Sequence, residues 1–273
     1  MIAPQLVKFF HKEEAKRKPG YVGLEYAWRQ KKDGVYGFLE ILDGEVLGPF
    51  TKKGNQLNGL KYQIQQNKEE LEFAIAKSMV SRGRLIFEIR DWLDKEDFYT
   101  VNGLTKRHKN QKMRFFIHDL LDWEMKNEKG WERENSLLIL SEYLPEGFEV
   151  LPVLYEGKDI EEAKNLYRKG VLLGWEGICG KCLSTEYRPG TRDYSLMKMK
   201  AEEKILGCKL IKHVPGEGNG AILVESNEVE FQVAGINDNL YQDLIKGRSQ
   251  KFFDIVCMSV NKSGRPREPR LCK

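Results

Sequence analysis

The chain has 273 residues and a mass of 31.7 kDa; 41% of its residues are hydrophobic and 32% are charged. This composition excludes a disordered or collagen-like protein, and no apolar run is long enough to cross a bilayer. Lys and Arg number 45 against 41 Asp and Glu, and the resulting net charge of +4 permits nucleic-acid binding without requiring it. We therefore expect a soluble, cytoplasmic protein that does not associate with membranes.

Along the first 200 residues, hydrophobic periodicity predicts a mixture of helices and strands. Helices are expected where apolar residues recur at helical spacing, over residues 5–17, 58–80, 132–144 and 160–169. Extended segments or strands are expected in β-branched and aromatic runs, over residues 21–30, 35–42, 84–90, 113–121, 148–154, 174–182 and 195–200.

The remaining part of the chain is different, because short strands alternate there with turn-rich stretches. The predicted strands cover residues 205–211, 220–225, 229–233 and 251–259. Short, evenly spaced strands are typical of a small barrel. We therefore predict a domain boundary near Lys200, with one domain over residues 1–200 and a second over residues 201–273.

The first motif that could carry chemistry is Lys31-Lys32-Asp33-Gly34, at the edge of a predicted strand. Residues two apart share a strand face, so Lys31 and Asp33 would point into one pocket and Lys32 away from it. An amine must be unprotonated to attack phosphorus, and burial or neighbouring cations can favour that state by lowering the lysine pKa. Lys31 is therefore a candidate nucleophile, although a surface turn could carry the same four residues.

Two further motifs lie near the end of the first predicted domain. Glu176-Gly177 is followed by Lys181 after three residues, in or near a strand. Farther along, Lys198 and Lys200 alternate with two methionines, so the two lysines share one face of a strand. Two ammonium groups on one face repel each other unless a polyanion lies between them or water solvates both. The alternation therefore indicates either a polyanion site or a solvated face.

Cys179 and Cys182 form a Cys-x-x-Cys pair, which could be half of a zinc site or a redox dithiol. The other three cysteines and the four histidines form no second close pair. A chance pair of strand cysteines is therefore the favoured interpretation. A non-enzymatic zinc or nucleic-acid-binding module that uses Cys179 and Cys182 stays open as an alternative from a different functional class.

The order of these blocks resembles that of the covalent nucleotidyltransferases, which include ATP-dependent DNA ligases, RNA ligases and mRNA capping enzymes. The shared blocks, in chain order, are Lys31-x-Asp33-Gly34, Glu88, residues 115–121, Glu176-Gly177 with Lys181, and Lys198-x-Lys200. Residues 187–192 and the Pro-Arg-x-Pro segment at 266–269 resemble DNA ligases in particular. Because only 30 residues precede Lys31, we expect no separate N-terminal DNA-encircling domain. The resemblance is thus to the small two-domain DNA ligases of phages and some bacteria.

The resemblance implies an α+β fold, with a nucleotidyltransferase (adenylation) domain of antiparallel sheets and flanking helices followed by a C-terminal OB-fold β-barrel. It implies that Lys31 takes AMP from ATP, that Glu176 binds the catalytic Mg²⁺ or Mn²⁺, and that Lys198 and Lys200 stabilise charge on the α-phosphate. The remaining implied nucleotide-binding residues are Asp33, Gly34, Lys52, Glu88, His118 and Lys181.

Three residues depart from the ligase pattern. His118 stands where an aromatic ring usually stacks on adenine, and Lys52 replaces an arginine, which loses a bidentate phosphate contact. Tyr36 stands where an arginine usually helps to hold the 5′-phosphate of a nick. These departures keep an RNA ligase open as an alternative. The expected partner is nicked double-stranded DNA, sealed by a monomer in repair, replication or phage recombination.

Overall fold

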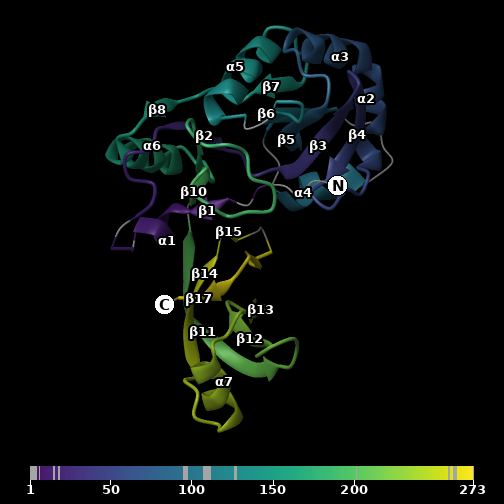
Figure 1. The fold of residues 1–273 in the computed structure, drawn as a ribbon. Helices are drawn as coiled ribbons and strands as arrows, with labels where there is room; N and C mark the ends of the chain where they lie inside the picture. The colour runs from purple at the N-terminus through teal and green to yellow at the C-terminus, as the bar shows by residue number, and fades with distance from the viewer. Residues whose placement is uncertain are drawn as a thin grey trace. The chain divides into compact units, whose positions relative to one another are not determined.

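The computed structural model describes residues 5, 7–14, 16–17, 19–94, 98–106, 112–125, 128–200, 202–257, 259–260 and 263–272. The chain divides into two compact units, Met1–Met199 and Lys200–Lys273 (Figure 1). Among the described residues, no helix is both long and apolar enough to span a membrane.

The first unit is built on two five-stranded sheets. The first sheet has the order β4-β3-β5-β6-β7, and its strands are β3 (Val35–Leu42), β4 (Glu45–Thr51), β5 (Gly83–Asp91), β6 (Met113–Asp122) and β7 (Phe148–Val150). The second sheet has the order β1-β10-β9-β2-β8, and its strands are β1 (Lys8–Phe9), β2 (Tyr26–Lys31), β8 (Tyr155–Gly157), β9 (Gly177–Cys182) and β10 (Leu196–Lys200). Most neighbouring strands are antiparallel, as predicted for the α+β fold.

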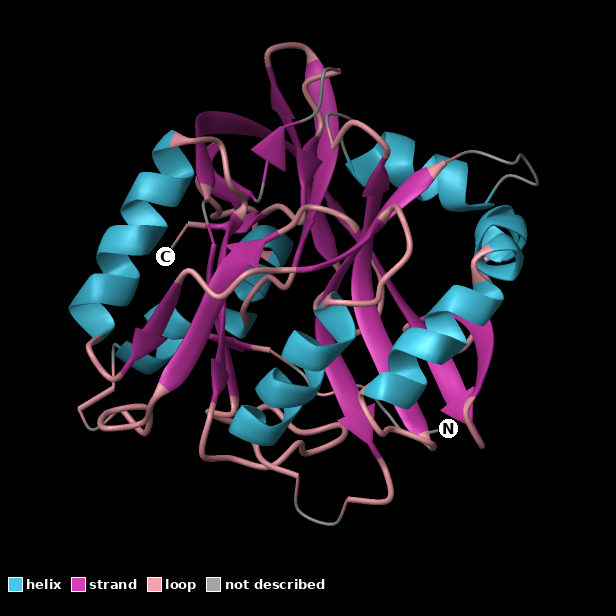
Figure 2. Ribbon diagram, turned by 90° about the horizontal axis from the view of Figure 1, so that it is seen from above, coloured by secondary structure: helices cyan, strands magenta, loops and turns pink. Residues whose placement is uncertain are grey.

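Helices pack on the outer face of each sheet (Figure 2). The first sheet is covered by η1 (Asn58–Leu60), α2 (Lys61–Gln66), α3 (Lys68–Lys77), α4 (Phe98–Lys106) and α5 (Gly130–Ser141). The second sheet is covered by α1 (Phe10–Glu14) and α6 (Ile160–Leu172). Each sheet therefore buries one face in its own apolar core, which leaves the opposite face available for polar side chains.

Several predicted elements have different bounds in the structure. The helix expected over residues 58–80 is interrupted at Asn67, whose backbone leaves the helical region, so α2 and α3 are separate. The helix expected over residues 5–17 begins with β1, because Lys8 and Phe9 pair with β10, and only α1 is helical among its described residues. Strands β4 and β8 and helix α4 were not predicted; β4 contains Gly48-Pro49, which in sequence suggests a turn.

The second unit is mainly β, as predicted. Its largest sheet has the order β13-β12-β11-β14-β17, with β11 (Glu203–Val214), β12 (Ala221–Ser226), β13 (Val229–Ala234), β14 (Phe252–Cys257) and β17 (Arg270–Leu271). Strands β15 (Ser259–Val260) and β16 (Pro266–Arg267) pair separately. Helix α7 (Asp238–Ile245), which was not predicted, is capped by the Asn237 side chain and packs Leu240 and Leu244 against the apolar core of this unit.

Candidate active site

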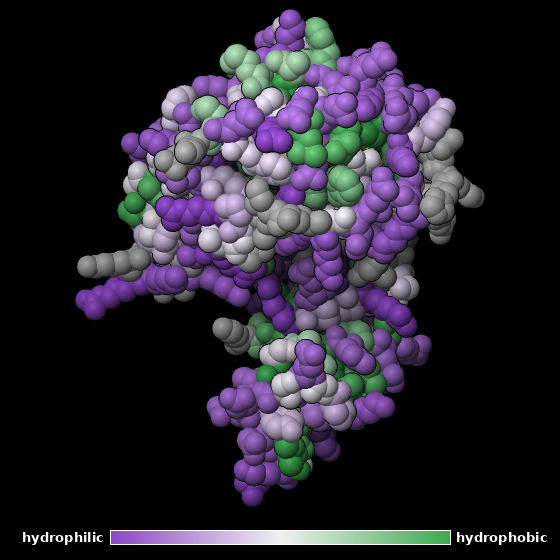
Figure 3. Space-filling model, turned by 45° about the vertical axis from the view of Figure 1, so that its right-hand side comes forward, coloured by the Kyte–Doolittle hydropathy of each residue, from purple (hydrophilic) through white to green (hydrophobic). Residues whose placement is uncertain are grey.

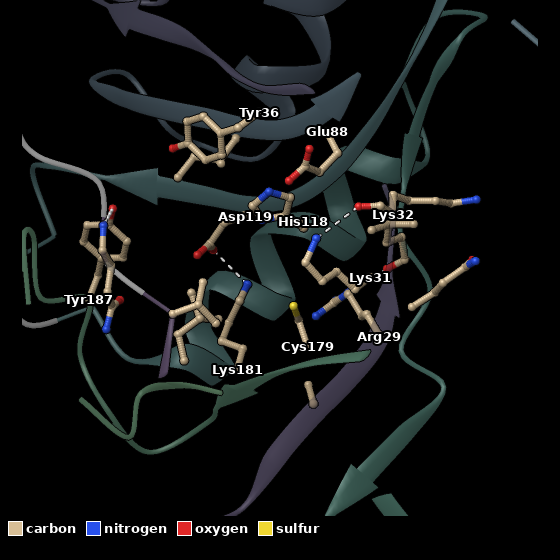
Figure 4. Close-up of a pocket in the computed structure, with 17 residues that line it drawn as sticks. Arg29, Lys31, Lys32, Tyr36, Glu88, His118, Asp119, Cys179, Lys181 and Tyr187 are labelled. Atoms are coloured by element: carbon tan, nitrogen blue, oxygen red, sulfur yellow. Dashed lines mark hydrogen bonds and ion pairs between the residues drawn. The ribbon is translucent and has the colours of Figure 1, made fainter. Parts of the chain in front are cut away.

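A cavity in the first unit is lined by residues of both sheets (Figure 4). The second sheet contributes Ala27, Arg29, Gln30, Lys31, Cys179, Lys181 and Leu196. The first sheet contributes Tyr36, Ile86, Glu88, His118 and Asp119. Of the predicted site residues, the structure therefore brings Lys31, Glu88, His118 and Lys181 together, although they are up to 150 positions apart in the sequence.

Strand alternation explains why β2 and β9 supply so many polar groups to the cavity. Trp28 is buried in the core of the second sheet, so its neighbours Arg29 and Lys31 on the strand face the other way, into the cavity. Opposite them, Arg29 is in register with Cys179 and Lys31 with Gly177. The two strands thus place a row of functional groups on one face.

Lys31 makes a short polar contact with another predicted site residue, Glu176. Its Nζ donates to Oε2 of Glu176 at 2.5 Å and to the backbone carbonyl of Lys32 at 3.3 Å. Burial lowers the pKa of the Lys31 amine, but the nearby carboxylates of Glu176 and Glu88 outweigh that effect and hold the pKa above its ordinary value. The resting amine is therefore a protonated ammonium, which must lose a proton before it can attack phosphorus.

Lys32 follows the end of β2, and its side chain is directed away from the Lys31 amine (Figure 4). It nevertheless lines the cavity, so the prediction that it would point away from the pocket is wrong. Its Nζ is 2.5 Å from Oδ2 of Asp94 and 4.1 Å from the centroid of the Phe116 ring. The two neighbouring lysines therefore have separate partners, and Lys32 offers a matched control for substitutions of Lys31.

Asp33 and Gly34 follow the end of β2, so strand alternation does not extend to them. The backbone carbonyl of Asp33 accepts from Nη1 of Arg90 at 2.5 Å. A Cβ atom at Gly34 would lie 2.5 Å from the carbonyl oxygen of Ile89, so only glycine allows the chain to approach β5 this closely. Both residues help to fix the backbone beside Lys31, and neither is among the described residues that line the cavity.

Glu88 and His118 lie on the wall formed by the first sheet. Glu88 is in register with Tyr36 on β3, and the rings of His118 and Tyr36 have centroids 6.4 Å apart. Burial lowers the pKa of His118 to about 4, so its imidazole is neutral at pH 7. A neutral, flat ring at this position is suited to stacking on a base.

A network of charged groups includes three residues that line the cavity, Arg29, Asp119 and Lys181, and the sequence analysis found only Lys181 among its members. Lys181 Nζ is 2.8 Å from Oδ1 of Asp119 and 2.9 Å from Oε1 of Glu134 on α5. Arg29 pairs with Glu134, and Arg133 Nε lies 3.2 Å from Asp119. The pKa values of both carboxyls are lowered, because these cations outweigh the effect of burial. The available signal for Arg29 was its position two residues before Lys31 on the same strand.

The remaining predicted residues are not among the described residues that line the cavity. Lys52 is exposed in the turn after β4. Lys198 has its Nζ 4.0 Å from the centroid of the Phe9 ring, and it shares a strand face with Leu196, which does line the cavity. Lys200 is 5% exposed, and Glu176 reaches the site through its contact with Lys31.

The cysteine pair does not form a common site. Cys179 lines the cavity, whereas Cys182 belongs to the apolar core on the other face of the second sheet. The described residues contain no group of three or more His, Cys, Asp or Glu side chains that could hold a metal ion. The zinc-module alternative is therefore not supported.

The carboxylates beside Lys31 suit a different kind of metal. Mg²⁺ in nucleotide sites is usually held by one or two carboxylates, with water and phosphate oxygens completing its shell. Glu176, with Glu88 close enough to influence the same amine, offers hard oxygen ligands of this type. The donor set therefore fits Mg²⁺ that arrives with a phosphate-bearing ligand.

Comparison of the sequence with known proteins finds short matches to DNA ligases, and no protein-family model matches. The DNA ligase of Thermococcus onnurineus (strain NA1) is 38% identical over 69 residues, which are 25% of this chain and 12% of that protein. The DNA ligase of Methanothermobacter thermautotrophicus is 26% identical over 162 residues, 54% of this chain and 28% of that protein. The matched region thus spans less than a third of either relative.

Solved structures match over the whole chain. A Lig E DNA ligase has a TM-score of 0.70 and 19% identity, covering 100% of this chain and 99% of that one. The ATP-dependent DNA ligase of bacteriophage T7, in complex with ATP, has a TM-score of 0.58 and 17% identity. That match covers 99% of this chain and 98% of the T7 chain. The chain has the fold of a small ATP-dependent DNA ligase. The predicted resemblance and the predicted fold, a nucleotidyltransferase domain and an OB-fold barrel, are therefore confirmed.

Proposed function

We propose that the chain is an ATP-dependent DNA ligase that joins 5′-phosphate and 3′-hydroxyl ends at nicks in duplex DNA, acting as a monomer. The observation that carries this proposal is Lys31, an amine directed into a cavity between two sheets, in a fold shared with ATP-dependent DNA ligases. Glu88, His118 and Lys181 surround the same space with a carboxylate, a flat neutral ring and a cation.

In the first step, the Lys31 amine would lose a proton and attack the α-phosphorus of ATP. A P–N bond forms, the bond from the α-phosphorus to the pyrophosphate oxygen breaks, and lysyl-AMP results. Catalysis of this kind depends on positioning and on charge neutralisation more than on proton transfer. Glu176 and Glu88 would hold Mg²⁺, which supplies such neutralisation when bound.

In the second step, AMP would pass from Lys31 to the 5′-phosphate at the nick, and Lys31 would recover its amine. In the third, the 3′-hydroxyl attacks that phosphate, AMP leaves, and the strand is sealed. The second unit would contribute contacts to the DNA backbone, because β11 carries exposed Lys204, Lys209 and Lys212. Figure 3 shows hydrophilic side chains over much of the visible surface of this unit.

The first test is covalent labelling with α-³²P-labelled ATP and Mg²⁺, followed by denaturing electrophoresis and mass spectrometry. A single AMP adduct is expected on the wild-type chain, and Lys31→Ala should abolish it. Lys32→Ala should retain most of the label, because the Lys32 amine has its own partners, Asp94 and the Phe116 ring. A label that survives Lys31→Ala would refute the assignment of the nucleophile.

The second test compares substrates for sealing: a nick in DNA–DNA, a nick in an RNA–DNA hybrid, and single-stranded RNA. The DNA nick should be sealed fastest, and added salt should slow sealing because phosphate contacts are screened. Faster joining of single-stranded RNA would favour the RNA ligase alternative and would give Tyr36 a role in a different 5′-end pocket.

A further inference from the structure

Phe9 lies beside Lys198, one of the two lysines that the family resemblance assigns to the α-phosphate, and the proposed reaction gives this aromatic residue no role. Strands β1 and β10 pair in parallel, and Phe9 is in register with Lys198. The Nζ atom of Lys198 is 4.0 Å from the centroid of the Phe9 ring. A cation within about 6 Å of a ring centroid is attracted by the negative face of the ring. The N-terminal strand therefore supplies a partner for the Lys198 ammonium.

The pair formed by Phe9 and Lys198 continues the wall of the cavity. Val7 and Leu196, which precede these two residues by two positions, both line the cavity. Alternate residues of a strand share a face, so the Lys198 side chain projects on the cavity side of β10. Burial raises the pKa of the Cys179 thiol, which lines the cavity, and the positive charge of Lys198 is close enough to oppose that rise. The Lys198 ammonium therefore lies at the edge of the cavity.

An aromatic ring is a suitable support for a cation that has to act on a phosphate. The quadrupole of a ring attracts an ammonium without neutralising it, so the full charge stays available for an anionic ligand. Lysine has a flexible four-carbon stem, and restricting that stem beforehand reduces the entropy lost when the ammonium meets the phosphate. Phe9 and Lys198 are both half-buried, which strengthens their attraction relative to a fully solvated pair. The ring thus limits the positions of the Lys198 ammonium and leaves its charge intact.

We propose that Phe9 is a positioning residue that holds the Lys198 ammonium at the edge of the cavity, ready to stabilise charge on the α-phosphate of a bound nucleotide. This inference rests on the proposed nucleotidyl transfer to Lys31. The ring acts through Lys198 and does not itself contact the nucleotide. Charge builds on the α-phosphate as the reaction proceeds, so the contribution of Phe9 should appear in the maximum rate more than in the half-saturating concentration of ATP.

The test measures lysyl-AMP formation on the full chain in single turnovers with ATP and Mg²⁺. Phe9→Leu removes the aromatic face and keeps an apolar side chain. It should lower the maximum rate about 5- to 30-fold, the factor that corresponds to the loss of a partly desolvated cation–π contact. The half-saturating concentration of ATP should change by no more than a few-fold. Should Phe9→Leu fail to unfold cooperatively in urea, Phe9→Met takes its place with the same expected result.

Two matched variants separate the aromatic face from other properties of Phe9. Phe9→Tyr keeps that face and should retain the maximum rate within a few-fold. Lys12 on α1 is an exposed second cation over the same ring, with its Nζ 5.4 Å from the ring centroid. Lys12→Ala should leave the rate unchanged, because the effect of the ring is carried by Lys198. A loss in either variant as large as that in Phe9→Leu would contradict the proposed role.

A double-mutant cycle shows whether Phe9 acts through Lys198. Lys198→Ala removes the ammonium, so adding Phe9→Leu to that variant should lower the rate by less than about twofold. Losses that multiply instead would mean that the ring acts by another route, and the proposal would be overturned. A maximum rate in Phe9→Leu that equals or exceeds the wild-type rate would overturn it as well.

Acylation with an amine-selective reagent, followed by mass spectrometry, tests the contact without any nucleotide. Lys198 should be acylated several-fold faster in Phe9→Leu than in the wild type, because the ring no longer covers its amine. Lys8 is the internal control, since its Nζ is 3.9 Å from the centroid of a different ring, that of Tyr194, and its acylation should not change. An unchanged acylation rate at Lys198 would refute the contact with Phe9, whereas an absent AMP label on the wild-type chain would refute nucleotidyl transfer itself.

Discussion

Replacing Glu176 by Gln tests two roles of this carboxylate, its observed contact with Lys31 and its proposed binding of Mg²⁺. Glu176 Oε2 accepts a hydrogen bond from Lys31 Nζ at 2.5 Å, and the Lys31 side chain is 18% exposed. The amide of Gln keeps the shape and can still accept that hydrogen bond, but it carries no charge. The change therefore removes both the main counter-charge of the ammonium and the hard anionic ligand proposed for Mg²⁺.

The two losses act in opposite directions on the rate of self-adenylylation. At 2.5 Å and an effective dielectric constant of about 20, the gross attraction between the two charges is about 7 kcal/mol before their desolvation is subtracted. Without it, burial of Lys31 is opposed mainly by Glu88, so the pKa of the amine falls and more free amine is present at neutral pH. An unperturbed lysine has a free amine in only about 1 molecule in 2,500 at pH 7, so this gain is large.

The rate of lysyl-AMP formation is to be measured in single turnovers from pH 6 to pH 10 for the wild type and Glu176→Gln. In the ligand-free chain, the pH at which the Lys31 amine loses its proton, followed by its reaction with an amine-selective acylating reagent, should move to lower pH in the variant. The plateau of the rate of lysyl-AMP formation should fall about 10²–10³-fold, because a preorganised charged ligand is lost. A variant with the wild-type pH profile and a rate within a few-fold would refute both roles.

Three further predictions concern stability and the second unit. Burial raises the pKa of Glu128 from 4.5 to about 7, so the folded state holds the proton more tightly and the free energy of unfolding falls as pH rises from 4.5 to 7. Urea unfolding of Glu128→Gln should therefore show a free energy of unfolding about 2–3 kcal/mol above the wild type at pH 8 and almost no difference at pH 4. An equal difference at both pH values would contradict this explanation. A Cβ atom at Gly180 would lie 2.8 Å from the buried Trp28 ring, so Gly180→Ala should destabilise by about 1–3 kcal/mol, whereas Gly103→Ala in α4, with open space around it, should not destabilise. A chain ending at residue 199 should form lysyl-AMP more slowly and seal a DNA nick at least about tenfold more slowly than the full chain, and undiminished sealing would remove the proposed DNA-binding role of the second unit.

Local hydrophobic patterns and the order of the motifs predicted the fold class and many of the strands. Long apolar runs such as Met113–Asp122 and Phe252–Cys257 are strands as expected. Most side chains of the first strand are buried on both of its faces, whereas the second strand begins with alternating exposed and buried residues. Helix α7 was missed because only eight residues form it and turn-rich sequence precedes it. Strand β4 was missed because Gly48-Pro49, which suggests a turn in sequence, lies within a paired strand.

The candidate site was predictable only where a motif marked it. Lys31 was found through its four-residue motif, and the structure brings it to Glu176 across 145 positions of sequence. Glu134 was missed because an ion pair between a strand and a distant helix leaves no spacing that a single sequence reveals. Arg29 was missed although its position two residues before Lys31 on the same strand was a usable signal. Strand register, which places Arg29 opposite Cys179, became known only with the fold.

The contact between Lys31 and Glu176 has a consequence for when the chain can react. In the ligand-free chain the nearby carboxylates raise the pKa of the Lys31 amine, so the proposed nucleophile is protonated at neutral pH. Cations that accompany a nucleotide would neutralise the same carboxylates, and burial, which favours the free amine, would then decide the protonation state. The residue that restrains Lys31 at rest is thus the residue proposed to bind the metal. The reactivity of Lys31 would therefore depend on the presence of the nucleotide, because a metal ion bound to Glu176 would weaken the attraction between this carboxylate and the Lys31 ammonium.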